Sequence, residues 1–271
     1  MSKLSDQDYL LTDQYRNASN LNARIQLHVR FSTNKYGWMP WVFDQLDLPP
    51  HCRVLELGCG PGELWLKNMQ RIPEGWDITL SDFSAGMLEE ARRNLSGSPR
   101  PFRFEVIDAQ SIPLEDEQFD AMTANHMLYH VPDRPKAFAE IRRVLKRGGR
   151  FYATTNGRSH LQEIEDLVRR FNPAAVEWRR DFIESFTLEN GAEELSRWFT
   201  SVRLRRYEDG LVVTEAEPLM AYVLSGLFGS ALTDDQTAAF RRFVENELAE
   251  HGTIRVTKDS GLFEAIRSDS A

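Results

Sequence analysis

The residues whose types and spacing most directly indicate chemistry form a glycine-rich loop, Gly58-Cys59-Gly60-Pro61-Gly62. Val54, Leu55 and Leu57 precede this loop and are typical of a buried parallel strand. Glycines let a backbone turn sharply and approach a ligand with no Cβ in the way. Residues 63–69 can form a helix, and a strand, a glycine loop and a helix together place a small ligand at the carboxyl end of a sheet.

A dinucleotide is the first ligand to consider for this loop, because its fingerprint is also a glycine motif, G-x-G-x-x-G. Glu63 takes the place of the third fingerprint glycine, and Glu56 stands two residues before Gly58. A carboxylate at the strand end disfavours a pyrophosphate, which prefers helix N–H groups and positive charge. It suits a ligand that carries an ammonium and a sulfonium. The spacing E-x-G-x-G-x-G resembles motif I of the class I S-adenosylmethionine-dependent methyltransferases.

A second carboxylate, Asp82, ends the next expected strand about twenty residues after the loop. An acid there can accept hydrogen bonds from both ribose hydroxyls, and dinucleotide folds use the same device. Asp82 therefore predicts an adenosine-containing ligand, with a plain helix-cap role as the alternative. Phe83 and Met87 can lie on the adenine face or in the core, and we hold both interpretations open.

A third carboxylate, Asp108, stands with Ala109 at the end of the third expected strand. The resemblance implies that this acid accepts from the adenine amino group, whereas an Asx turn is the alternative for Asp108 taken alone. Three carboxylates at the ends of three successive strands favour a common ligand site.

The resemblance continues beyond these acids. Residues 119–133 are similar to the fourth-strand segment of small-molecule methyltransferase families, and residues 144–151 match their "hLkpGGxh" motif. It covers residues 51–156 well and 202–267 loosely. It implies S-adenosyl-L-methionine as cofactor and methyl transfer to a small-molecule acceptor. The Asn/Asp-Pro-Pro-Tyr tetrad of enzymes that methylate exocyclic amines is replaced by Asn125-His126-Met127-Leu128, which argues against that substrate class.

The predicted cofactor contacts come from the loop and from the strand ends. They are Glu56, Gly58, Cys59, Gly60, Gly62, Asp82, Phe83, Met87, Asp108, Ala109, Asn125 and His126.

A general base is needed only if the acceptor must lose a proton, and the candidates for it are His126, Tyr36 and, after these, His130. His126 follows the fourth strand and is expected to point towards the ligand crevice. Tyr36 lies in the aromatic segment 30–41, which can cover the cofactor as a lid or pack as an ordinary amphipathic helix. His126 and His130 are four residues apart, but no third ligand stands at matching spacing, so we predict no metal site.

The elements that must position these residues alternate between strand and helix. Strands are expected at 54–57, 77–80, 102–107, 119–124, 150–155 and 202–207, and a last strand over 253–266 is either continuous or broken at 258–261. Ser84 and Asp133 can cap the helices that follow them, and Gly148-Gly149 is expected to end the second of these helices. Further helices are expected over 5–48, 157–200, 217–228 and 234–251.

This order predicts an α/β fold, a Rossmann-like seven-stranded, mostly parallel sheet with helices on both faces and a helical lid. We divide it into an N-terminal helical cap (1–50), an S-adenosylmethionine-binding core (51–156), a helical insertion or lid (157–200) and a segment that completes the sheet (201–271).

Composition limits the other function classes. The chain has 271 residues, 41% of them hydrophobic, and a net charge of −8, which disfavours a nucleic-acid partner. Two cysteines fit a reducing compartment, and neither a signal peptide nor an apolar run of membrane-spanning length is evident. We therefore expect a cytoplasmic enzyme that acts on a small molecule, without a membrane partner. The alternatives are an NAD-linked oxidoreductase and a non-catalytic S-adenosylmethionine-binding regulator.

Overall fold

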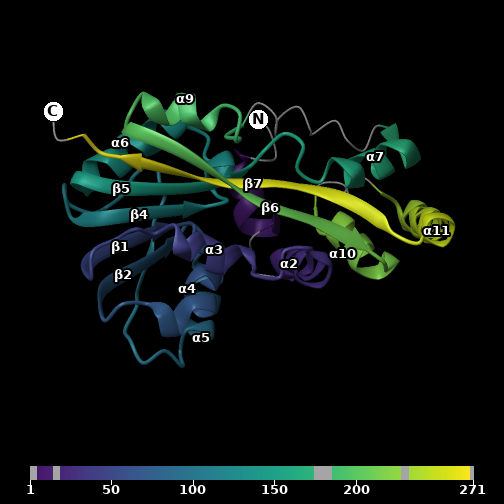
Figure 1. Ribbon diagram of the computed structural model, residues 1–271, viewed down its shortest axis with the longest axis horizontal. Helices are drawn as coiled ribbons and strands as arrows, with labels where there is room; N and C mark the ends of the chain where they lie inside the picture. The colour runs from purple at the N-terminus through teal and green to yellow at the C-terminus, as the bar shows by residue number, and fades with distance from the viewer. Residues whose placement is uncertain (1–4, 15–18, 174–184, 227–231, 269–271) are drawn as a thin grey trace.

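A seven-stranded sheet with strand order β3-β2-β1-β4-β5-β7-β6 forms the centre of the computed structural model, which describes residues 5–14, 19–173, 185–226 and 232–268 (Figure 1). β1 to β5 are parallel, and β7 is antiparallel to both β5 and β6. The strands are β1 (His51–Leu57), β2 (Gly75–Asp82), β3 (Arg103–Val106), β4 (Phe119–Asn125), β5 (Leu145–Asn156), β6 (Thr200–Val213) and β7 (Ile254–Ile266). The predicted α/β fold with a seven-stranded, mostly parallel sheet is confirmed.

Helices cover both faces of the sheet and leave its central strands buried. Val54, Leu55 and Leu57 of β1 are at most 1% exposed, as expected for a parallel strand covered on both sides. One face packs mainly against α6 and α9, and the other against α3, α4 and α5. These helices are α3 (Trp38–Asp44), α4 (Glu63–Asn68), α5 (Ala85–Asn94), α6 (Arg134–Val144) and α9 (Gly191–Ser196).

The strand order reverses beside β1, because the chain continues from β1 to β2 on one side and returns to β4 on the other. In open α/β sheets, ligands bind in the crevice outside the carboxyl ends of the strands at such a point. The glycine loop follows β1 at this position.

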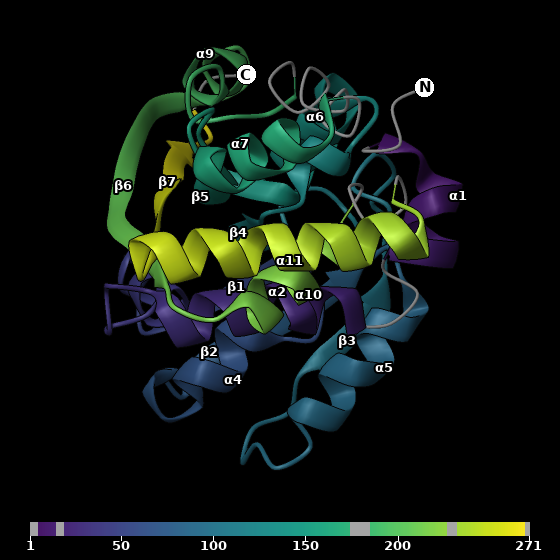
Figure 2. The ribbon, with the colours of Figure 1, turned by 90° about the vertical axis from the view of Figure 1, so that its right-hand side faces the viewer.

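The last two strands extend beyond the rest of the sheet. Residues 254–259 of β7 pair only with residues 208–213 of β6, and this two-stranded ribbon carries a separate apolar core. Four helices contribute to that core and surround the end of the ribbon (Figures 1 and 2). They are α2 (Ser19–Phe31), α7 (Gln162–Phe171), α10 (Ala216–Leu224) and α11 (Asp234–His251).

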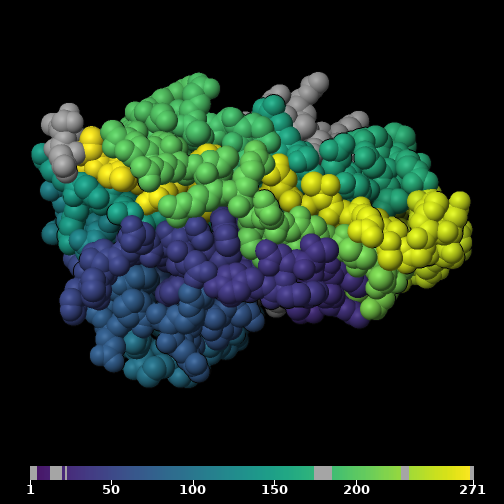
Figure 3. All heavy atoms as spheres, viewed as in Figure 1, coloured from purple at the N-terminus to yellow at the C-terminus, as the bar shows by residue number. Residues whose placement is uncertain are grey.

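The first helical residues are α1 (Gln7–Tyr9) and a π-helical turn (Leu10–Gln14). In the space-filling view, the purple N-terminal part of the chain lies between the blue β1–β3 half and the green and yellow ribbon (Figure 3). None of the helices in the described part of the chain is long and apolar enough to span a membrane.

Both predicted helix caps are confirmed. Ser84 Oγ accepts from the backbone N–H of Met87 at 3.3 Å, and Asp133 Oδ1 accepts from that of Lys136 at 3.0 Å. Each side chain satisfies an N–H that the first helical turn leaves without an internal partner.

The prediction that Gly148-Gly149 ends a helix is wrong. α6 already ends at Val144, and Leu145 pairs with Phe119 as the first residue of β5. The glycines lie inside β5, at a shift in its register against β4. A Cβ on Gly149 would come within 2.7 Å of the carbonyl oxygen of Lys146, so this bulge requires glycine.

Of the two alternatives for the last strand, the continuous one is confirmed: β7 runs without a break through 258–261, because this stretch pairs with β6 along its whole length. Two other expected boundaries differ. Within 157–200, the described helices are α7 and α9 only, and Phe186 is buried in the non-helical stretch before α9. Trp178 and Phe182, which fall in the helical stretch expected over 157–200, lie outside the described residues. α10 ends at Leu224 rather than continuing to 228.

Candidate functional site

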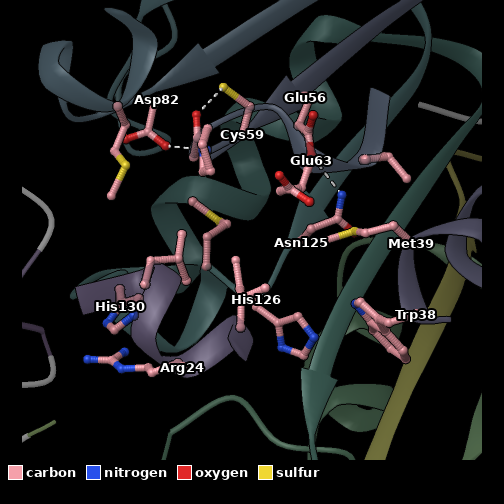
Figure 4. Close-up of a pocket in the computed structure, with 18 of the residues that line it drawn as sticks. Arg24, Trp38, Met39, Glu56, Cys59, Glu63, Asp82, Asn125, His126 and His130 are labelled. Carbon is pink, nitrogen blue, oxygen red and sulfur yellow. Dashed lines mark hydrogen bonds between the residues drawn. The ribbon is translucent and has the colours of Figure 1, made fainter. Parts of the chain in front are cut away.

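A cavity of about 690 Å³ opens at the carboxyl ends of β1, β2 and β4 (Figure 4). This volume lies within the ~300–1,000 Å³ that small-molecule sites typically enclose. The sheet side of the cavity holds the glycine loop. The π-helical turn after α1, together with α2 and α3, closes the other side with apolar residues that include Leu10, Leu21 and Met39. The N-terminal helices thus cover the cavity, as the interpretation of segment 30–41 as a lid anticipates.

The glycine loop needs its glycines for two different reasons. Gly58, Gly60 and Gly62 have φ of +66°, +53° and +80°, in the left-handed region that other residues rarely adopt. A Cβ on Gly58 would also lie 2.8 Å from Met127 Cβ. Gly60 instead borders open space, with no atom closer than 3.7 Å to such a Cβ, and it lines the cavity.

Gly62 is the one predicted cofactor contact that does not line the cavity. It is the N-cap of α4, and its Cα packs where a Cβ would come within 3.0 Å of Leu95. Its position indicates a role in joining the loop to α4 and α5 rather than in touching a ligand.

Asp82 ties the end of β2 to the loop. Its Oδ2 accepts from the backbone N–H of Gly60 at 2.8 Å, and its Oδ1 accepts from that of Ser84 at 2.8 Å. Burial raises the pKa of Asp82, and these backbone hydrogen bonds oppose the rise. The backbone N–H of Phe83 is a third donor, and a carboxylate offers about four lone pairs, so this fixed group retains acceptor capacity for a ligand hydroxyl.

Glu56 is the most deeply buried of the three carboxylates, at 2% exposed. Its Oε2 accepts from Trp65 Nε1 at 2.5 Å and its Oε1 from Asn125 Nδ2 at 2.7 Å, the second of which is drawn in Figure 4. Burial raises the pKa of Glu56 to about 7, the two hydrogen bonds lower it, and the charge of Asp82 raises it further. Both protonation states of Glu56 are therefore populated near neutral pH, and a nearby positive ligand would favour the ionised one.

Asp108 forms the Asx turn considered for it and also lies at the cavity wall. Its Oδ1 accepts from the backbone N–H of Gln110 at 2.9 Å, which is an Asx turn, and its Oδ2 accepts from Gln7 Nε2 at 3.3 Å. Ala109, Phe83 and Met87 line the same part of the cavity. The structure thus brings these predicted adenosine contacts together.

His126 is held in a strained backbone conformation. Its φ is +51°, which costs a residue with a Cβ about 1–2 kcal/mol, and its N–H donates to the carbonyl oxygen and Oγ1 of Thr154 at 3.2 and 3.0 Å. This turn directs the imidazole towards Trp38, whose ring centre lies 5.2 Å away (Figure 4). Burial, together with Lys258, lowers the pKa of His126 to about 4, so the ring is neutral at pH 7 and can accept a proton only weakly.

Tyr36 lines the cavity, but its side chain is 54% exposed. Its hydroxyl donates to Asp44 Oδ2 at 2.5 Å, and this hydrogen bond raises the pKa of the phenol. A hydroxyl that already donates to a carboxylate is a poor proton acceptor, so the geometry favours His126 over Tyr36 as a base. Arg30, another residue of the segment, instead pairs with Glu215 at 2.8 Å.

The structure adds residues that the sequence did not reveal. Trp65 lies behind Glu56 and donates to it, and the far end of the cavity is lined by His28, His160, Tyr222 and Lys258. A Trp on the helix that follows the loop is only a weak sequence signal that its indole N–H donates to a residue of the loop or strand. The other four are isolated in the sequence and carry no signal. Within the described ranges, no group of three or more His, Cys, Asp or Glu side chains is placed to hold a metal ion.

Comparisons with known proteins agree with this geometry. Residues 55–153 match the sequence profile of a family described as a methyltransferase domain. A demethylmenaquinone methyltransferase from Desulfitobacterium hafniense is 34% identical over 115 residues, which are 42% of this chain and 46% of the relative. A ubiquinone/menaquinone biosynthesis C-methyltransferase UbiE from Desulfotalea psychrophila is 34% identical over 113 residues, 42% of this chain and 45% of the relative. The chain thus spans less than half the length of these relatives.

Solved structures share the fold at low sequence identity. Phosphoethanolamine N-methyltransferase 2 from Haemonchus contortus, in complex with S-adenosyl-L-methionine, gives a TM-score of 0.61 at 18% identity and covers 97% of this chain and 60% of its own. The YcgJ protein from Bacillus subtilis gives 0.59 at 17% identity, over 86% of this chain and 98% of its own. The profile match and the shared fold thus support a class I S-adenosylmethionine-dependent methyltransferase domain over residues 55–153.

Proposed function

We propose that this protein binds S-adenosyl-L-methionine and transfers its methyl group to a small-molecule acceptor. One observation carries the proposal: Glu56, Asp82 and Asp108 border a single cavity beside the glycine loop, and that cavity continues past them to a separate set of side chains. A protein that only bound the cofactor would need the part of the cavity beside the carboxylates but not its continuation.

The residues fit the parts of the proposed cofactor. We assign Asp82 to the ribose hydroxyls, Asp108 to the adenine amino group and Glu56 to the ammonium, because all three line the cavity beside the glycine loop. Gly60 keeps φ at +53° and leaves room for close approach. The cofactor, when bound, supplies an electrophilic methyl group on a sulfonium.

The chain's own tasks are then alignment and the exclusion of water, since an in-line displacement needs little covalent help. Trp38 and Met39, on α3, cover the cavity from the side opposite the loop. His126 stands at the end of β4 with a neutral imidazole, and it can accept a proton from an acceptor that is already acidic.

The names of the curated relatives support a finer proposal for the acceptor. Those reported above are a demethylmenaquinone methyltransferase and a C-methyltransferase of ubiquinone and menaquinone biosynthesis. Carbon methylation of a quinone-type ring is therefore the first acceptor class to test.

Calorimetry with S-adenosylmethionine, S-adenosylhomocysteine and NADH tests the cofactor. We expect the first two to bind, and Asp82→Asn to weaken both by about tenfold or more through the loss of charged hydrogen bonds. Asp77→Asn is the matched control, because Asp77 lies on the same strand but pairs with Arg103 at 2.6 Å on the surface. NADH binding without S-adenosylmethionine binding would favour the oxidoreductase.

Activity requires its own assay. Methyl-labelled cofactor is incubated with the protein and either reduced naphthoquinones or a metabolite extract, and labelled products are separated. Tight cofactor binding with no labelled product in either mixture would point to a regulatory protein that only binds the cofactor.

A further inference from the structure

The far end of the cavity differs in chemistry from the end that borders the glycine loop. We call it the acceptor end and define it by six lining residues: His28, Trp38, His126, His160, Tyr222 and Lys258. They come from α2, α3, the turns after β4 and β5, α10 and β7, and so unite the sheet with the helices packed on the β6–β7 ribbon (Figure 2).

Flat rings form the walls of the acceptor end. His28 stacks on His160 with ring centres 6.2 Å apart and planes at 28°, and Tyr222 meets His28 edge-on at 6.1 Å. Trp38 lies 5.2 Å from His126 (Figure 4). Such surfaces favour a planar guest, because rings stack or meet edge to face.

A buried ammonium supplies the charge at this end. Lys258 is 8% exposed and pairs with Asp209, which is fully buried, at 2.5 Å. Its other hydrogen bond, to Ser32 Oγ, is long at 3.4 Å. A lysine ammonium has three donors, so Lys258 keeps one N–H for a ligand.

Asp209 is already satisfied without Lys258. Its oxygens accept from the hydroxyls of Ser32 and Thr33 and from the backbone N–H groups of Asn34 and Gly210, the last three at 3.1, 2.9 and 2.8 Å. These donors disperse the charge of the carboxylate, so it neutralises the ammonium only in part.

The carboxylates that line the cavity in the described part of the chain all stand at the other end. Glu56, Glu63, Asp82 and Asp108 come from β1, α4, β2 and the loop after β3. Burial and the nearby Lys258 lower the pKa of His28 to about 3, and His126 is likewise neutral, so the histidines add no charge. The acceptor end thus presents a cation without a competing lining carboxylate.

Two polar atoms in these walls lack a hydrogen-bond partner among the described residues: Trp38 Nε1 and His28 Nδ1. The indole nitrogen can only donate. A buried donor left unpaired costs free energy, so a ligand oxygen that reached it would be bound more tightly.

We propose that the acceptor end binds a planar acceptor with an ionised oxygen, such as a ring hydroxyl in its anionic form, and that Lys258 receives this oxygen between the rings of Trp38 and His28. The proposal rests on the methyltransferase function proposed above and names its substrate class. Ionisation of a ring hydroxyl also makes the oxygen and its neighbouring ring carbons nucleophilic, so the same contact that binds the acceptor prepares it to take a methyl group.

The test uses three probes on protein saturated with S-adenosylhomocysteine. They are 2-hydroxy-1,4-naphthoquinone, which is anionic at pH 7.5, its neutral 2-methoxy analogue, and the cation phenyltrimethylammonium. Binding is followed by calorimetry. We expect the anion to bind about tenfold or more tighter than the methoxy analogue, as for a charge-assisted hydrogen bond.

Two variants examine the role of the ammonium. Lys258→Gln removes the charge and keeps an N–H for Asp209, and Lys258→Met combined with Asp209→Asn removes the buried pair. We expect the preference for the anion to fall to about twofold or less in both, with S-adenosylhomocysteine affinity unchanged. Lys146→Met is the control, because Lys146 pairs with Asp120 at 2.7 Å outside the cavity.

The outcomes separate the two proposals. Equal binding of the anion and its methoxy analogue, no binding of either, tighter binding of the cation, or a preference that survives in both Lys258 variants would each overturn the proposal for the acceptor end. Failure of the unmodified protein to bind S-adenosylhomocysteine would instead overturn the proposed function.

Discussion

Binding of S-adenosylmethionine should release a proton from Glu56. The carboxyl is 2% exposed and has a pKa of about 7, because burial outweighs the hydrogen bonds from Trp65 and Asn125. The proposed ligand places a positive charge beside it and should stabilise the ionised form. The perturbation is Glu56→Gln, which keeps the shape and one acceptor oxygen but has no proton to lose.

The size of the effect follows from two pKa values. An opposite charge within about 4–6 Å lowers the pKa of a carboxyl by about 1–3 units, so a pKa of about 7 becomes about 5 in the complex. The protein then releases about 0.8 protons per ligand at pH 6, about 0.5 at pH 7 and about 0.1 at pH 8. By the same linkage, affinity is about tenfold weaker at pH 6 than at pH 8.

Calorimetry measures the proton directly, because the observed enthalpy changes with the ionisation enthalpy of the buffer. Titrations in three buffers at each pH give the number of protons released. The α-amino group of the ligand titrates at about pH 7.7–8.0 and should take up protons on binding at the upper end of this range. The difference between the wild-type protein and Glu56→Gln removes that contribution.

Equal proton release at pH 6 by the two proteins would refute this reasoning, as would pH-independent affinity in the wild type. The folded state provides an independent check. Folding raises the pKa of Glu56 from 4.5 to about 7, so protonated Glu56 contributes about 3 kcal/mol to the free energy of unfolding below about pH 4.5. This contribution is lost as the pH rises through about 7. Urea unfolding of Glu56→Gln should lack this decline.

Three further predictions concern other contacts. Trp65→Phe leaves Glu56 Oε2 without its donor and should lower the free energy of unfolding in urea by about 1–3 kcal/mol. Because this hydrogen bond lowers the pKa of Glu56, its loss should also shift the proton release to higher pH. An unchanged midpoint would show that the hydrogen bond contributes nothing. Gly58→Ala should abolish cofactor binding in calorimetry, because φ at this position is +66° and the new Cβ would lie 2.8 Å from Met127 Cβ. Gly97→Ala is the control and should leave binding intact, because a Cβ there has no atom within 4 Å. Burial raises the pKa of Asp209, but the hydrogen bond from the Lys258 ammonium and the other donors outweigh it and lower the pKa to about 2. The free energy of unfolding that ionised Asp209 contributes is therefore present above about pH 4 and lost as the pH falls towards 2. Asp209→Asn should flatten this acid limb of the stability curve, and an unaltered limb would contradict the assignment.

Local signals were enough to predict the elements that carry the site. Ser84 caps α5 as expected, and a short polar side chain before an apolar helical run determines that start without help from the rest of the fold. The end of α6 was mispredicted because a glycine pair usually stops a helix. Here Leu145 pairs with Phe119, and strand pairing with a distant segment overrides the local preference.

The sequence by itself determined the cofactor half of this protein. Glu56, Asp82 and Asp108 lie at or just beyond the carboxyl ends of β1, β2 and β3. Parallel strands bring these ends to one edge of the sheet, so the order of the chain is enough to gather the three acids. Only the tertiary structure decided the acceptor half. Trp38, His28 and Lys258 are brought together by the packing of α2 on the β6–β7 ribbon and of Trp38 against Tyr207 of β6, over sequence separations that carry no periodic signal. Contacts of that kind depend on how complete elements pack, and no local pattern encodes them.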